Sequence, residues 1–285
     1  MSKLRLIFLI TIVALQSACS GGGGGGGSTS DDIESTNATD TTDTTDTTDT
    51  CDEPLTSLSG AYLEFDLATN VKAVLSANGC TVAFESAGKP DHTSSYWDSA
   101  NASGLYVDPV DAALFDAQRS PGDIEDYTND YDLTVSVNPE LATISSSTSL
   151  GAIGIAVSGG PLFNDSEGTG DLSLGVMQGF DRNGAHTGPE TYHYHLEPTA
   201  ISDNNENLVG IIADGFFIYG RKCYSTSNYP TDLDESNGHT SITQHTGAAD
   251  ADAEYHYHVS NEQYLGGDYY LVFPGNYQGT ASAIN

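Results

Sequence analysis

Half of the histidines in this chain stand in two copies of one tetrapeptide, Tyr-His-Tyr-His. The copies occupy residues 192–195 and 255–258 of a chain that has eight histidines. On a β-strand, residues two apart project from the same face, so His193 and His195 point together and the two tyrosines point the other way. Two imidazoles at that spacing reach one metal ion, with ring nitrogens about 2.0–2.1 Å from it. Each tetrapeptide therefore predicts a metal-binding face backed by a packing face of tyrosines.

The second tetrapeptide places its two histidines in the same way. Two copies suggest an internal repeat, but their flanking sequences do not align, and we therefore expect them to form two arms of a single site. His186 lies shortly before the first copy, close enough to fold back as a third ligand. His239 lies in "LDESNGHTS", beside acidic residues. The predicted metal ligands are thus His193, His195, His256, His258, His186 and His239.

The ligand types indicate which ion would bind. Imidazoles without a cysteine suit copper, zinc, iron or nickel. Met177 is the only methionine after residue 50, which argues against a thioether site for Cu(I). Copper(II) or zinc is therefore the predicted ion. His245 has no supporting context and is expected on the surface, while His92, in "GKPDHTSSYW", fits a simple turn as well as a site.

Three acidic residues are candidates for a general base beside a metal-bound water: Asp214, Asp234 and Glu235. Asp214 precedes a glycine, so a role in a turn is the stronger expectation for it. If four histidines bind one ion, the site is closed and structural or sequestering. If only three bind, a position stays open for water or substrate.

The N-terminus has the pattern of an export signal. Residues 1–19 carry Lys3 and Arg5, then an apolar stretch and small residues before Cys19. "LQSAC" is similar to a bacterial lipobox, which predicts lipidation of Cys19 and a membrane anchor, with ordinary cleavage near Ala18 as the alternative. Ser20 after the cysteine favours the outer membrane over the inner one.

Residues 20–52 predict a disordered linker, and residues 53–285 a single domain. Gly21–Gly27 are consecutive glycines, and "TDTTDTTDTTDT" has no apolar residue to bury. The whole chain has 40 acidic residues against 8 Lys and Arg. Nucleic acid is therefore excluded as a partner, because binding it needs basic residues.

Three cysteines remain after Cys19. An exported protein favours a disulfide, and either Cys51–Cys80 or Cys80–Cys223 leaves one odd thiol.

The apolar pattern mostly has the period of a strand. It predicts strands at the ranges 61–67, 81–86, 131–137, 150–159 and 267–273. Asn207–Gly220 predicts a hairpin with an Asp-Gly turn. Val110–Gln118 is the only helical stretch expected. The predicted fold is all-β or β-dominated, a sandwich or jelly-roll-like domain after the disordered tether.

Several motifs occur in an order that resembles the YHYH family of exported proteins. They include "GKPDHTSSYW", "GAIGIAVSGGPLFN", "DRNGAHTGPETYHYH", "IIADGFFIYG", "LDESNGH" and "EYHYHVS", and they span roughly Cys80 to Gly279. Ala185 stands where the family more often has Gly. Ser236 stands where it more often has Cys, which removes a usual disulfide partner and would account for an odd Cys223. The resemblance implies the identity of the domain and the location of its site rather than a reaction.

Three functions compete. The first is a lipoprotein that binds copper or zinc for metal handling or sequestration outside the cytoplasm. The second is a metal-dependent hydrolase or oxidase, and the third is a non-catalytic surface module that binds glycan or protein. Serine-hydrolase, NTPase and dinucleotide-binding motifs are missing from the sequence.

Overall fold

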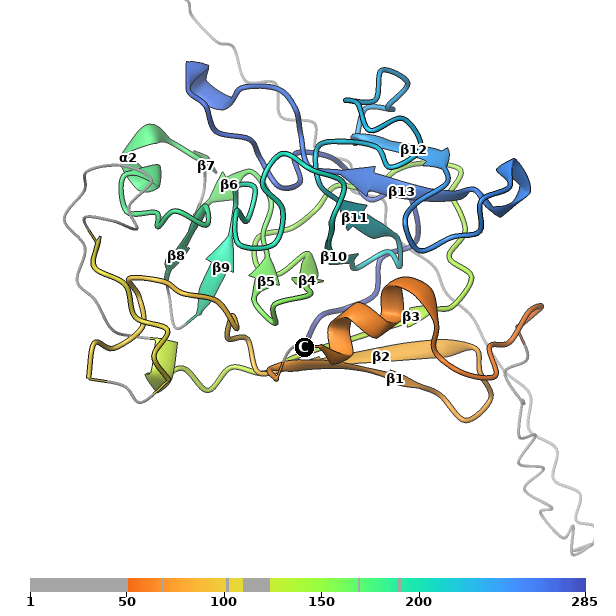
Figure 1. Ribbon diagram of the computed structural model, residues 1–285, viewed down its shortest axis with the longest axis horizontal. Helices are drawn as coiled ribbons and strands as arrows, with labels where there is room; N and C mark the ends of the chain where they lie inside the picture. The colour runs from red at the N-terminus through yellow and green to blue at the C-terminus, as the bar shows by residue number, and fades with distance from the viewer. Residues whose placement is uncertain (1–50, 68, 101–102, 110–123, 169, 189–190) are drawn as a thin grey trace, which may run out of the picture. The chain divides into compact units, whose positions relative to one another are not determined.

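Short strands joined by turns make up most of the regular structure, as the sequence pattern predicts. The computed structural model (Figure 1) describes residues 51–285 except 68, 101–102, 110–123, 169 and 189–190. The predicted export signal with Cys19, residues 20–50 of the predicted linker and the helix predicted at Val110–Gln118 lie outside the described residues. Within the described part, no helix is long and apolar enough to cross a membrane.

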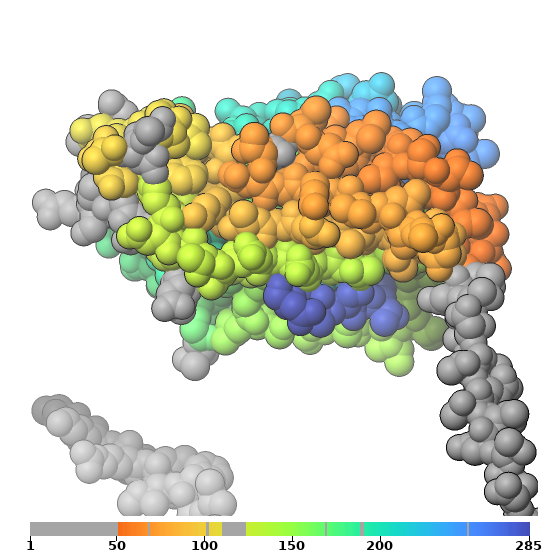
Figure 2. Space-filling model, turned by 90° about the horizontal axis from the view of Figure 1, so that it is seen from below, coloured from red at the N-terminus to blue at the C-terminus, as the bar shows by residue number. Residues whose placement is uncertain are grey.

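A small antiparallel sheet forms one layer of the domain. It contains β1 (Val71–Leu75), β2 (Thr81–Ser86) and β3 (Tyr131–Ser136), so two predicted strands are confirmed. The C-terminal residue, Asn285, exchanges backbone hydrogen bonds with Asp132 of β3. Figure 2 shows this blue C-terminal segment along the edge of the layer. A disulfide joins Cys51 to Cys80, which resolves the pairing that the sequence left open.

Two predicted strands are wrong. Residues 61–67 belong mostly to a 3-10 helix, η1 (Gly60–Asp66), because Tyr62 and Phe65 are buried on one side of a helical turn. Phe65 packs against Phe84 of β2, with ring centroids 4.6 Å apart. Residues 267–273 follow another 3-10 helix, η4 (Tyr264–Gly266), and make only an isolated bridge between Leu271 and Leu196.

The second layer is an eight-stranded sheet with the order β12-β13-β11-β10-β4-β5-β9-β8. Its strands are β4 (Gly154–Ala156), β5 (Pro161–Leu162), β8 (Ala185–Thr187), β9 (Tyr192–Tyr194), β10 (Leu208–Ile212), β11 (Phe217–Tyr219), β12 (Gly238–Ser241) and β13 (Glu254–His258). The loops between them contain β6 (Ser166–Glu167), β7 (Gly170–Asp171), α2 (Leu174–Met177) and η3 (Asp250–Asp252), and η2 (Ile124–Asp126) precedes β3.

The two halves of this sheet have the same strand order. If the four strands of each half are numbered along the chain, they run third, fourth, second, first from the edge of the sheet to its centre. Strands β4, β5, β8 and β9 form the first half, and β10, β11, β12 and β13 form the second half. β4 pairs with β10 at the centre, where Ile155 lies opposite Ile211. In both halves the two strands nearest the centre form a hairpin. The next strand outward, β9 or β13, is parallel to its inner neighbour, and the edge strand, β8 or β12, is antiparallel to β9 or β13. The sheet therefore has approximate two-fold symmetry about the central pair.

The two hairpin turns have the same conformation. Gly159 ends the β4–β5 turn with φ 94°, and Gly215 ends the β10–β11 turn with φ 93°, a region that favours glycine. The Asp214–Gly215 hairpin predicted from the sequence is thus confirmed, and a matching turn stands in the other half. The chain contains the internal repeat that its flanking sequences did not reveal.

The main core lies between the two layers. Val82, Phe84 and Leu133 of the small sheet belong to the same buried cluster as Ile155 and Ile211 of the large sheet. All five side chains are buried, and burial of apolar area is the main force that holds such layers together. This core fixes the large sheet, which carries both Tyr-His-Tyr-His strands.

Two candidate metal centres

The first centre lies at one edge of the large sheet. His186 of β8 stands directly opposite His193 of β9 in the antiparallel ladder. His195 follows β9, and Glu167 reaches the same point from β6. One ligand atom from each of these four residues lies within 4.8 Å of the others. Neighbouring strands and one loop thus bring together three imidazoles and a carboxylate.

The carboxylate faces ring nitrogens on three sides. Oε2 of Glu167 lies 3.1 Å from Nε2 of His195, 3.5 Å from Nε2 of His186 and 3.9 Å from Nε2 of His193. Nδ1 of His195 donates to the carbonyl of Asn164 at 2.7 Å. In a neutral ring, that proton on Nδ1 leaves Nε2 with a lone pair. Lone pair and carboxylate then face each other, an arrangement that a cation between them stabilises.

His193 is a buried ring without hydrogen bonds. Its side chain is 1% exposed, and neither Nδ1 nor Nε2 has a hydrogen-bond partner within the described structure. Phe163 stacks on this ring, with centroids 3.9 Å apart. Buried polar groups without a partner are rare in proteins, and an ion is one of the explanations for them. The residues of this centre therefore fit a bound metal.

The protonation states also suit ligands. Burial, and then the nearby His193 and His195, lower the pKa of His186 to about 3. Burial likewise lowers the pKa of His193. At neutral pH, His186 and His193 are neutral and the carboxylate is ionised, which are the forms that bind metals.

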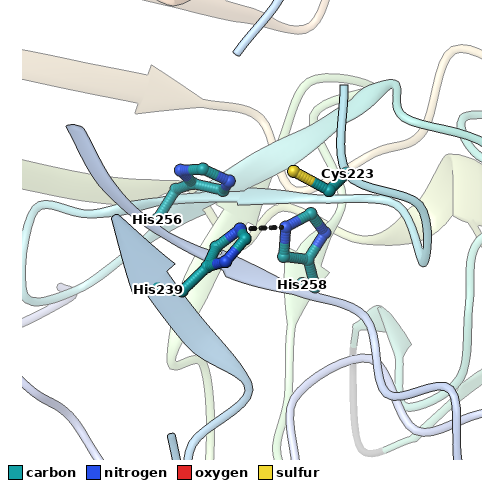
Figure 3. A group of neighbouring side chains, drawn as sticks. All are labelled: Cys223, His239, His256 and His258. Carbon is teal, nitrogen blue, oxygen red and sulfur yellow. Dashed lines mark hydrogen bonds between the residues drawn. The ribbon is translucent and has the colours of Figure 1, made fainter. Parts of the chain in front are cut away.

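The second centre lies at the opposite edge of the same sheet. His239 of β12 stands opposite His256 of β13 in the ladder, and His258 ends β13. Cys223, which follows β11, supplies a sulfur to the group. Figure 3 shows the three rings and the thiol gathered around one point. All four side chains are buried, with Cys223 at 1% and His239 at 8% exposed.

Each imidazole of the second centre has its Nδ1 engaged by an acceptor. His258 donates to the carbonyl of Gly220 at 2.7 Å, His256 to that of Glu254 at 3.0 Å, and His239 to the carboxylate of Asp232 at 3.0 Å. In the neutral rings, Nε2 keeps the lone pair. Nε2 of His239 and Nε2 of His258 lie only 3.2 Å apart. Two lone pairs at that distance favour a cation near them, and Nδ1 bonds of this kind typically orient histidine ligands.

The thiol of Cys223 is poised to ionise. Burial raises its pKa, but the neighbouring His256 and His258 side chains and the hydroxyls of Ser225 and Ser241 outweigh burial and lower the pKa to about 3. The thiolate is the form of cysteine that binds metals. The structure therefore places a cysteine with the three imidazoles of this cluster, which the sequence pattern did not predict.

The two centres occupy equivalent positions in the two halves. His195 and His258 donate from Nδ1 to the carbonyls of Asn164 and Gly220, each at 2.7 Å. Asn164 and Gly220 each follow the second strand of a hairpin. Asn164 lies three positions before Glu167, and Gly220 lies three positions before Cys223. Glu167 and Cys223 are thus counterparts.

The tyrosines confirm the predicted packing face and extend the equivalence. Tyr192 donates to Asp181, and Tyr255 donates to Asp234 in the corresponding place. Tyr194 bonds Ser158, whereas Tyr257 donates to Asp214. Three of the four tyrosines are fully buried: Tyr192, Tyr194 and Tyr257.

The expectation of a single site with two arms is wrong. Four strands, β11, β10, β4 and β5, separate β9 from β13 in the sheet, and each tetrapeptide belongs to its own cluster. All six histidines predicted as ligands lie in the two clusters, three in each. The sequence reasoning missed Glu167 and named Cys223 only as an odd thiol. Their equal spacing from the hairpins was the available signal.

The candidates for a general base lie elsewhere. The carboxylate of Asp214 accepts hydrogen bonds from Tyr257 and from the backbone of Gln278 and Gly279. Asp234 accepts from Tyr255 and from the turn before β12. Both contact the tyrosine face, which is opposite to the histidines. Glu235 accepts from Ser145 at 3.3 Å.

The two remaining histidines are outside both clusters. His245 is not a free surface residue, because its ring contacts Tyr219 and Glu64 at 3.2 Å and its side chain is only 11% exposed. The ring of His92 packs against Tyr194 and bonds its hydroxyl at 2.5 Å. Both histidines therefore help to pack the sheet.

Comparison with known families gives a match over part of the chain. The family model described as YHYH protein matches residues 132–231, which confirms the resemblance over that stretch. The matched stretch contains the whole first centre and Cys223, while His239, His256 and His258 lie beyond it. Searches of curated proteins and of solved structures found no match.

Proposed function

We propose that this YHYH domain protein binds a transition metal, copper or zinc, at two separate centres and handles or sequesters it outside the cytoplasm. One observation carries the proposal: at two places in the sheet, four ligand atoms of buried or half-buried side chains lie within 4.8 Å of one another. Imidazole with carboxylate or thiolate is a ligand set that suits both metals.

The proposed location is the outer membrane, with a lipid on Cys19 as the anchor. The export-signal pattern of residues 1–19 supports this location, and the flexible composition of residues 20–50 suits a tether to a membrane. The Cys51–Cys80 disulfide is consistent with it, because disulfides persist in oxidising compartments. Metabolic labelling with a radioactive fatty acid tests the anchor: the label should appear in the wild type and vanish in Cys19→Ala.

Elemental analysis of the purified full chain tests metal binding. We expect two equivalents of metal in the wild type and one in His193→Ala/His195→Ala, because only the first centre loses its ligands. His256→Ala/His258→Ala should also retain one equivalent, at the other centre.

His245→Ala is the matched control, since this histidine lies outside both clusters, and it should keep two equivalents. Equal metal content in the wild type and both double variants would reject the proposed function.

A further inference from the structure

The counterparts Glu167 and Cys223 make the two centres chemically different. Each centre has three imidazoles from equivalent strands, and the ring centroids are 4.5–5.5 Å apart in the first centre and 4.9–5.1 Å apart in the second. The imidazole sets are therefore nearly the same. The fourth group is a hard oxygen ligand in one centre and a soft sulfur ligand in the other.

The surroundings of the fourth group strengthen this difference. Sγ of Cys223 lies 3.1 Å from the hydroxyl of Ser225 and 3.2 Å from that of Ser241, so polar neighbours orient it and stabilise a thiolate. Hydrogen bonds of this kind to a ligand tune its metal. Within the described part of the chain, the polar contacts of the Glu167 carboxylate are with ring nitrogens of the cluster, and its side chain is 31% exposed.

Access to the two centres also differs. In the second centre, Cys223, His256 and His258 are each 1% exposed. In the first, Glu167 and His186 reach solvent, with side chains 31% and 13% exposed. The first centre is therefore the more accessible of the two to solvent. An ion in the second centre is enclosed by four protein groups, as in closed four-ligand sites.

We infer that the two centres select different classes of metal, and that the residue at the position shared by Glu167 and Cys223 sets the difference. This inference rests on the proposed function. The Cys223 centre holds a thiophilic ion such as Cu⁺ or Zn²⁺ in closed coordination, because thiolate favours soft ions. The Glu167 centre takes a divalent ion that tolerates oxygen ligands, and it exchanges that ion with solvent more readily.

Cobalt and cadmium are suitable probes for the two centres. Co²⁺ is coloured and gives a sulfur-to-metal charge-transfer band only where a thiolate binds it, while Cd²⁺ is colourless and prefers sulfur. The metal-free full chain is loaded with Co²⁺ and then titrated with Cd²⁺. We expect two equivalents of Co²⁺ to bind. The first equivalent of Cd²⁺ should abolish the charge-transfer band, while the weaker visible bands of the Glu167 centre persist.

Reciprocal variants provide the matched comparison. Cys223→Glu should still bind two equivalents of Co²⁺, without the charge-transfer band. Its affinity for Cd²⁺ at that centre should fall at least about tenfold, because mutation of residues that only contact a ligand already lowers metal affinity by about that factor. Glu167→Cys should double the amplitude of the band. Cys223→Ser, which changes one atom, replaces Cys223→Glu if circular dichroism shows that the latter does not fold.

The possible outcomes separate the two ideas. If the wild type binds no Co²⁺, both the proposed function and this inference fall. If it binds two equivalents but Cd²⁺ displaces them without preference, or if Cys223→Glu keeps the Cd²⁺ affinity of the wild type, this inference is overturned while the proposed function stands.

Discussion

Four histidines in the two candidate centres donate to the protein from Nδ1, which leaves Nε2 available for a metal. Nδ1 of His195, His256 and His258 faces a backbone carbonyl, and Nδ1 of His239 faces the carboxylate of Asp232. Backbone carbonyls cannot be substituted by mutation. Among the described residues, Asp232 is the side chain that accepts a hydrogen bond from Nδ1 of a candidate ligand, so its substitution can change the orientation of that ring without removing the ring itself.

Substitution of Asp232 should weaken the second centre alone. Its side chain is 71% exposed, so Asp232→Ala should have little effect on folding. The ring of His239 would lose its acceptor, and we expect metal affinity at that centre to fall about 10–100-fold. Competition with a chromophoric chelator measures this affinity. Glu235→Ala, which removes an exposed acid nearby, is the control, and an affinity unchanged in Asp232→Ala would contradict the assigned role.

At the scale of elements, the central pair of strands determines whether the two halves can join. A Cβ added at Gly210 would lie 2.4 Å from the carbonyl oxygen of Ile155, and one added at Gly154 would lie 2.4 Å from that of Ile211. Both contacts are with backbone, which cannot move without separating β4 from β10. Glycine is therefore required at both positions by the close approach of the strands.

Gly210→Ala should destabilise the protein by about 1–3 kcal/mol, the usual cost of overpacking a core. Urea unfolding gives the free energy of unfolding of the variant and the wild type. Gly170→Ala is the matched control, because a Cβ there meets no heavy atom within 4 Å. Equal stability of Gly210→Ala and the control would show that the central pair is not tightly packed.

The sequence predicted the elements that have a local signal. The alternation in the Tyr-His-Tyr-His segments and the Asp-Gly turn were sufficient for β9, β13 and the β10–β11 hairpin. Residues 61–67 show the limit, since Tyr62 and Phe65 suit the buried side of a helical turn as well as an alternating strand. Only packing against Phe84 decides between them.

The candidate site was predicted by residue type but not by arrangement. The histidines were found because two copies of one motif are conspicuous. The number of centres depends on which strands pair, and the loops between equivalent strands differ in length, so the repeat has no constant spacing in the sequence. Glu167 remained hidden among the 40 acidic residues because its signal, a spacing from the hairpin equal to that of Cys223, becomes visible only after the repeat is known.

At the scale of the whole molecule, buried histidines in both halves link stability to pH. Burial lowers the pKa of His92, His186, His193 and His256 below the usual 6.5. Between the folded and unfolded pKa values, the unfolded chain binds more protons than the folded one. The free energy of unfolding therefore rises with pH in that window, and this stability is lost as the pH falls below about 6.5.

For the metal-free protein, we expect the free energy of unfolding to decrease as the pH is lowered from 6.5 towards 5. Urea unfolding with a chelator present, at a series of pH values, measures the slope. His92→Gln should reduce the slope by up to about 1.4 kcal/mol per pH unit, the contribution of one proton. The comparison of two proteins cancels most of the contribution of buried acids such as Asp214, whose pKa burial raises. A wild-type slope in His92→Gln would show that the pKa of His92 is not lowered in the folded protein.

The pairing of β4 with β10 has a consequence for the origin of the chain. Every ligand of the first centre lies between Glu167 and His195, and every ligand of the second lies between Cys223 and His258. A half-length ancestor could therefore have built a complete centre alone and joined a second copy of itself along that strand as a symmetric homodimer. Gene duplication and fusion of such an ancestor would yield the present sheet. In such a lineage each fused copy would mutate independently, which would allow a thiol in one and a carboxylate in the other.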